Sequence, residues 1–157
     1  MLAEERPGAR NVATASHNRA AATIADAVRL CRELAHNLNA EGFGLFFLGA
    51  KGEARRLAPV FDSSFPGALP ITRMLSARGG EDFARRISDA AVPLWWRPAG
   101  GPLFLTASAR CWAEEIEPPV ADKSAIALPV SVERGRSGAV VFHGDDMVID
   151  ETRLCDT

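Results

Sequence analysis

Two apolar runs separated by a short polar reversal stand out in the C-terminal half of the chain. Ala125–Val132 carries apolar residues at every second position, and Ala139–His143 is largely apolar on both alternating faces. Between them, Glu133–Gly138 is charged and contains glycine, which is typical of a tight turn between paired strands. Because both faces are apolar, we expect a central hairpin in a sheet covered on each side. Pro129 conflicts with full pairing, since proline lacks the N–H for one ladder hydrogen bond.

A helical pattern precedes the other predicted strands. Apolar residues recur there at steps of three and four, which predicts an amphipathic helix with one buried stripe. The stripe consists of Ile24, Ala27, Val28, Cys31, Leu34, Ala35 and Leu38. We expect Ser16 to be the N-cap and residues 39–42 to end the helix. Residues 1–14 lack periodicity and are predicted to form a loose arm, which leaves 15–157 as a single domain.

The segments between this helix and the hairpin predict two strands, three short helices and one extended piece. In the extended piece Trp95 and Trp96 are adjacent, so their side chains should point to opposite faces. A further element, a helix from Asp150, would follow the hairpin. The predicted segments are strands over Phe43–Gly49 and Ala54–Asp62, helices over Ala68–Ala77, Glu81–Asp89 and Thr106–Ile116, and the extended piece Val92–Trp96.

This order of elements predicts the fold class. Strands joined as hairpins and separated by helices favour an α+β fold, in which helices cover both faces of a sheet. We therefore expect an α/β/α sandwich with a central antiparallel sheet, the arrangement of PAS- and GAF-like domains.

Composition narrows the class of protein. The 157 residues are 47% hydrophobic and 24% charged, with a net charge of -2, so the basic surplus of a free-standing nucleic-acid-binding domain is missing. The three cysteines are far apart and without C-x-x-C spacing, which indicates a reducing, cytoplasmic setting. The N-terminus lacks a signal-peptide h-region, and no apolar run reaches the ~18 residues of a membrane span.

Candidate chemistry is sparse. His17, His36 and His143 are scattered, without the paired spacing of a metal site or of a base beside a nucleophile, so we expect each to be structural or exposed. The serine, histidine and aspartate residues fit no nucleophile elbow. We therefore predict no enzyme, no catalytic residue, no metal and no cofactor.

Three stretches carry a family resemblance. The first is GFGLFFLGAKGEARRL after the opening helix, and the second is Glu81-Asp82-Phe83 followed by Val92-Pro93-Leu94-Trp95-Trp96. The third is the hairpin SAIALPVSVERGRSGAVVFHG, with a Leu-Pro inside its first strand. Together, over roughly residues 20–145, they resemble the autoinducer-binding half of LuxR-type quorum-sensing regulators. The family has a proline inside the corresponding strand, which would account for Pro129.

The resemblance implies a ligand pocket between the sheet and one helical layer. In the family this pocket holds an acyl-homoserine lactone, with a Trp donating to the lactone carbonyl and a Tyr and an Asp binding the amide. Matching Trp96 to the family's downstream tryptophan puts the acidic position at Glu81 or Asp82. The lactone-binding Trp and the Tyr would then fall near Leu69 and Arg73, where neither matches, and the chain contains no tyrosine. The ligand could therefore be a different small apolar molecule as well as a lactone.

The ligand-binding residues that we predict come from five of the expected elements. They are Phe61, Leu69, Arg73, Asp82, Trp96, Ile126 and Leu128. Arg73 could recognise a carboxylate or phosphate, or be an exposed helix arginine. Asp82 could bind a ligand amide, or interact with the first-turn amides of its own helix.

As function, the resemblance implies the sensing domain of a transcriptional regulator, which binds a small apolar signal and controls dimerisation. Its partners would be the signal and a second copy or a related regulator, with no direct nucleic-acid contact and no membrane. One alternative is a ligand-free interaction protein that heterodimerises with a full-length regulator and inhibits it. Another is a GAF-type domain for a nucleotide or tetrapyrrole, for which no cysteine or histidine is convincingly placed.

LuxR-type proteins continue into a helix-turn-helix domain, and this chain stops where that linker would begin. We expect one of three alternatives, which the sequence leaves open: a natural effector-only protein, a truncated relative that forms inactive dimers, or the sensor half of a longer regulator.

Overall fold

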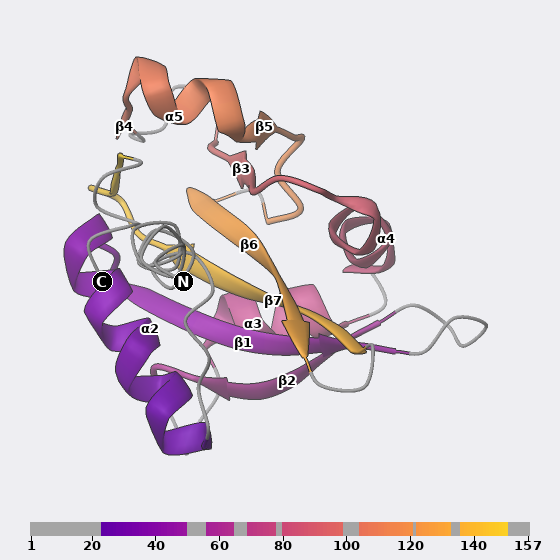
Figure 1. The fold of residues 1–157 in the computed structure, drawn as a ribbon. Coiled ribbons are helices and arrows are strands. Elements are labelled where there is room, and N and C mark those ends of the chain that lie inside the picture. The colour runs from indigo at the N-terminus through magenta and orange to yellow at the C-terminus, as the bar shows by residue number, and fades with distance from the viewer. Residues whose placement is uncertain are drawn as a thin grey trace, which may run out of the picture.

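A six-stranded sheet with helices on both faces forms the fold (Figure 1). The computed structural model describes residues 23–49, 56–64, 69–77, 80–98, 104–120, 122–132 and 136–150. Its helices are α2 (Ile24–Leu38), α3 (Pro70–Ser76), α4 (Glu81–Asp89) and α5 (Ala107–Trp112). The strands are β1 (Gly42–Leu48), β2 (Leu57–Asp62), β3 (Leu94–Trp96), β4 (Phe104–Leu105), β5 (Glu114–Glu115), β6 (Ala125–Val132), β7 (Arg136–His143) and β8 (Val148–Ile149). The predicted α+β fold class is confirmed.

The predicted hairpin is central in this sheet. The strand order is β2-β1-β7-β6-β3-β5, so β6 and β7 each have a strand on both sides. Strand β3 pairs with β6 only as far as Ala127, so Pro129 lies beyond the stretch where β6 has two neighbours. The missing N–H of Pro129 therefore need not break a ladder on that side. The sheet is not wholly antiparallel as predicted, because β3 and β5 pair in parallel.

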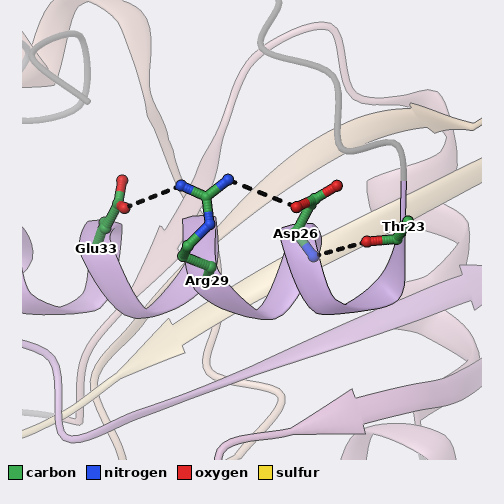
Figure 2. A network of polar contacts seen from close by, with 4 residues as sticks. All are labelled: Thr23, Asp26, Arg29 and Glu33. Atoms are coloured by element: carbon green, nitrogen blue, oxygen red, sulfur yellow. Dashed lines mark hydrogen bonds and ion pairs between the residues drawn. The ribbon is translucent and has the colours of Figure 1, made fainter.

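Helix α2 begins at a different N-cap residue from the predicted one. Thr23, not Ser16, is the N-cap, and its hydroxyl accepts a hydrogen bond from the Asp26 backbone N–H at 3.1 Å (Figure 2). Arg29 lies 3.6 Å from both the Asp26 and Glu33 carboxylates along the exposed side. Such pairs stabilise a helix by only about 0.2–0.5 kcal/mol each, so the opposite, apolar side attaches α2 to the sheet.

The predictions for the remaining elements had different outcomes. Helix α4 has the predicted bounds. Helix α5 ends at Trp112 rather than at residue 116, because Glu114–Glu115 leaves the helix and pairs with β3. The pairing of β4 with β8 was not predicted. Ser16, His17, Cys155, the 1–14 arm and the helix after Asp150 lie outside the described residues.

Two separate cores lie on the two faces of the sheet. On the α3/α4 face, residues of these helices pack against Trp96, Leu94 and Phe46. On the α2/α5 face, Cys31, Ala35 and Leu38 of α2 and Ala109 of α5 pack against the sheet; that core also contains Phe43, Trp95, Ile126, Val140 and Phe142. Trp95 and Trp96 point to opposite faces, as predicted.

Candidate functional site

The central strands present small residues to the α3/α4 face. Ala125 and Ala127 of β6 and Ala139 of β7 belong to that core and are completely buried. On β1, Gly42 and Gly44 lie opposite His143 and Val141 of β7. The next residues along the same strands, which point to the α2/α5 face, are large. These small residues, together with the larger Phe46 and Val141 of the same strands, therefore form a floor beneath helices α3 and α4.

Four register partners form a row across this floor. Trp96 pairs with Ala125, Ala125 with His143, and His143 with Gly42. We call these four residues the cross-strand row. Since adjacent strands are ~4.8 Å apart, the Trp96 and His143 backbones are separated by about 10 Å, and Ala125 is the residue between them on the sheet.

Both large members of the row bury polar atoms without a partner. Trp96 is 0% exposed and its indole Nε1 has no hydrogen-bond partner among the described residues. His143 is 7% exposed, and neither its Nδ1 nor its Nε2 has a hydrogen-bond partner in the described part of the chain. A buried polar group without a partner costs about 1–3 kcal/mol, so such groups are uncommon and require an explanation.

The imidazole of His143 occupies the space that Gly42 leaves open. A Cβ atom at Gly42 would lie 2.7 Å from His143 Cε1 and Nε2 and 2.9 Å from Ser63 Oγ. Burial lowers the pKa of His143, and the charge of Lys123 lowers it further. The carboxylates of Glu41 and Asp62 oppose this shift without reversing it. At neutral pH the ring is therefore uncharged, with one donor nitrogen and one acceptor nitrogen.

Asp62, in contrast, is a satisfied buried carboxylate. Its Oδ1 accepts from the Ser64 backbone N–H (2.9 Å) and hydroxyl (2.8 Å), and Oδ2 accepts from the Leu69 N–H (2.8 Å). Burial alone would raise the pKa of Asp62, but these hydrogen bonds, with a contribution from the Thr72 hydroxyl, lower it. Thr72 Oγ1 is buried and has no partner of good hydrogen-bond geometry in the described part of the chain. Asp62 thus fixes the start of α3 through the Leu69 N–H and lies beside the Thr72 hydroxyl of that helix.

An open cleft of about 500 Å³ lies beside the α3/α4 core, between α4 and the segment after β5. Its lining residues are Asp82, Phe83, Arg85, Arg86, Ile116, Glu117, Pro118 and Pro119. Phe83 also contacts Trp96, with ring centroids 5.3 Å apart at an interplanar angle of 75°. One aromatic side chain therefore connects the cleft with the cross-strand row.

The structure does not bring the seven predicted ligand-binding residues together. Trp96 belongs to the α3/α4 core and Leu69 packs at its border. On the α2/α5 face, in contrast, lie Phe61, Ile126 and Leu128. Arg73 is exposed on α3, and Asp82 is exposed on α4 at the rim of the cleft, 3.4 Å from Arg85. Only Leu69, Trp96 and Asp82 therefore lie on or beside the face of the cross-strand row.

Sequence reasoning missed the second polar member of this face. His143 was expected to be structural or exposed, and its burial against Gly42 depends on strand register. Gly42-Phe43-Gly44 was the available signal, because alternate glycines in a strand leave room on one face.

Other chemistry is limited in the described ranges. They contain no group of three or more metal-ligating side chains. Cys31 is buried, and burial raises the pKa of its thiol to about 11, whereas Cys111 is exposed. No helix among these residues is long and apolar enough to span a membrane.

Comparison with known proteins agrees with the fold. No protein-family model and no curated protein matches the chain. Among solved structures, it is similar to the GAF domain/HD domain protein from Geobacter sulfurreducens, at 17% identity and a TM-score of 0.51. The match covers 81% of this chain and 79% of that one. At this identity the likeness concerns the fold alone, so the chain has a GAF-like fold.

Proposed function

We propose that this chain is the signal-sensing domain of a LuxR-type transcriptional regulator. It binds a small, largely apolar molecule on the α3/α4 face and controls dimerisation. The observation that supports this most is the burial of Trp96 Nε1 without a partner, above a floor of small residues.

The unpaired atoms are unevenly distributed between the two faces. Trp96 and His143 have unpaired nitrogens on the α3/α4 face. On the α2/α5 side only Trp112 Nε1 shares this state among the described residues. A ligand with polar groups that pair with these atoms would remove their desolvation cost, and its apolar part would lie on the floor.

Ligand binding would act through stability. A molecule that binds only the folded domain stabilises it by RT ln(1 + [L]/Kd), which is about 2.7 kcal/mol at a hundredfold excess over Kd. Because α3 and α4 are short, of 7 and 9 residues, their positions depend on packing against the sheet. Ligand burial beneath them would therefore order this layer, and a dimer that uses it would form more readily.

A thermal-shift screen tests this proposal. The probes are acyl-homoserine lactones, aryl analogues and cell extract, with native mass spectrometry on every hit. We expect a saturable rise in Tm with a defined added mass. Trp96→Phe should lose this rise, whereas Trp112→Phe, which removes the unpaired indole on the other face, should keep it.

Two results would contradict the proposal. If Trp96→Phe folds and its ligand response equals that of the parent protein, Trp96 does not bind the ligand. If no probe shifts the Tm and the protein is already dimeric, the ligand-free interaction protein becomes the better account.

A further inference from the structure

We infer that the open cleft between α4 and the segment after β5 binds a small primary amine with an apolar body, whose ammonium group pairs with Glu117. Neither Trp96 nor His143 is among the residues that line this cleft. It is therefore a second site beside the α3/α4 core, independent of the ligand site proposed above.

The cleft offers both room and apolar surface. Its volume of about 500 Å³ lies within the range of ~300–1,000 Å³ that is usual for small-molecule sites. Phe83 and Ile116 are only 3% and 7% exposed, so their side chains form its buried part. Pro118 and Pro119 continue this surface outward, since Pro118 is exposed and Pro119 is half-buried. A ligand whose apolar body lies on these side chains removes that body from water, which favours binding.

The charges at the cleft do not cancel once the ion-pair partners are counted. Arg85 lies 3.4 Å from the Asp82 carboxylate, and Arg86 lies 3.4 Å from the Glu114 carboxylate. Glu117 is the remaining charged side chain of the lining, and in the described part of the chain it takes part in no hydrogen bond or ion pair. The unmatched negative charge of the cleft is therefore that of Glu117.

An unmatched carboxylate selects a cationic ligand. A primary ammonium group supplies one positive charge and three hydrogen-bond donors, which a carboxylate can accept. An anionic ligand, in contrast, would have to compete with Asp82 for Arg85 or with Glu114 for Arg86, and Glu117 would repel it. Because Glu117 is exposed, its ion pair adds only a modest part of the affinity, and the apolar body supplies most of it.

Four probes separate the contribution of the head group from that of the body. Phenethylamine, phenethyl alcohol and phenylacetate share a phenyl ring and a two-carbon chain and differ in charge, whereas butylamine resembles the side chain of lysine. Binding is followed by NMR titration of the protein. We expect phenethylamine to bind about threefold more tightly than phenethyl alcohol, as for an exposed ion pair, and phenylacetate to bind most weakly of the three. Butylamine should bind at least about tenfold more weakly than phenethylamine, because it lacks the ring.

Three variants test the role of Glu117. Glu117→Gln should weaken phenethylamine binding by about threefold and leave phenethyl alcohol binding unchanged. Glu115→Gln is the matched control and should change neither affinity, because Glu115 is exposed on β5 and does not line the cleft. Arg86→Met removes a cation from the cleft and frees the Glu114 carboxylate, so it should strengthen phenethylamine binding by about twofold.

Nuclear Overhauser contacts between phenethylamine and the Phe83 ring locate the site in the unmodified protein, whether or not any variant folds. Equal affinities for phenethylamine and phenethyl alcohol, full phenethylamine affinity in a folded Glu117→Gln protein, or no contact with Phe83 would each overturn the inference. Butylamine that binds as tightly as phenethylamine would also overturn it, since the apolar body would then contribute nothing and the lysine of a partner protein would bind equally well.

Discussion

The two faces of the sheet are built from the same strands but packed in different ways. On the α2/α5 face, Phe43 contacts Phe61 edge-on at 6.2 Å and Phe142 at 6.3 Å, and Ile126 is completely buried beside them. On the α3/α4 face, alanine and glycine occupy several strand positions beside the large Phe46 and Trp96, and buried polar atoms remain unpaired. The first face contributes stability through large apolar side chains. The second contributes less at its alanine and glycine positions, and the proposed ligand site lies on this face.

The largest effect is expected on the well-packed face. Phe142→Ala removes a completely buried ring from the central strand, and it should lower the free energy of unfolding by about 3–5 kcal/mol. Urea denaturation with and without a bound ligand measures this loss. A loss below about 1 kcal/mol would mean that the α2/α5 face is not the more tightly packed of the two.

Gly42→Ala tests the α3/α4 face. The added methyl group would collide with the His143 ring, so the free energy of unfolding should fall by about 1–3 kcal/mol. In a His143→Ala background the same change should cost much less, because the colliding ring is gone. Additive losses in this double-mutant cycle would show that the two side chains do not compete for one space.

A smaller effect on the free energy of unfolding is expected when the pH is lowered. The pKa of His143 is lowered in the folded protein, so the unfolded chain takes up a proton near pH 6.5 while the folded protein does not. The contribution of neutral, buried His143 to the free energy of unfolding is thus fully present above pH 6.5. It is lost as the pH falls below 6.5, with a slope of at most about 1.4 kcal/mol per pH unit.

Measuring Tm from pH 8 to pH 5 tests this sign. His143→Asn should flatten the curve above pH 5, whereas His36→Asn, which changes an exposed histidine of α2, should not. A curve that stays equally steep in His143→Asn would assign the effect to other groups.

The smallest expected difference concerns the cysteines, and it is one of reactivity rather than stability. Cys31 lies in the α2/α5 core with its pKa raised to about 11, and Cys111 is exposed. In a Cys155→Ser background at pH 8, a thiol reagent should modify Cys111 rapidly and Cys31 only on unfolding. Rapid modification of both in the folded protein would show that the α2/α5 face opens easily.

Local patterns predicted much of the fold. The alternation in Ala125–Val132 identified the central hairpin, and the adjacency of Trp95 and Trp96 placed their rings on opposite faces. The two-residue strands β4, β5 and β8 were not predicted, because two residues carry no periodicity and their pairing partners are distant in sequence.

The candidate site was less accessible to sequence reasoning. Phe61, Ile126 and Leu128 were grouped with Trp96, although all three lie on the other face. Strand alternation places Ile126 and Leu128 there, and the register shift between β1 and β2 affects only the stretch that contains Phe61. The cross-strand row depends on the joint register of β3, β6, β7 and β1, which no local pattern encodes. Whether a buried nitrogen has a partner likewise depends on three-dimensional packing.

The most direct test of a ligand site on the α3/α4 face is the indole ¹H–¹⁵N spectrum of the protein, recorded before and after addition of a ligand found by thermal shift. We expect the Trp96 N–H signal to move downfield as it gains an acceptor, while the Trp112 signal, from the other face, stays in place. A saturating ligand that moves only Trp112, or neither signal, would contradict a binding site between the sheet and helices α3 and α4.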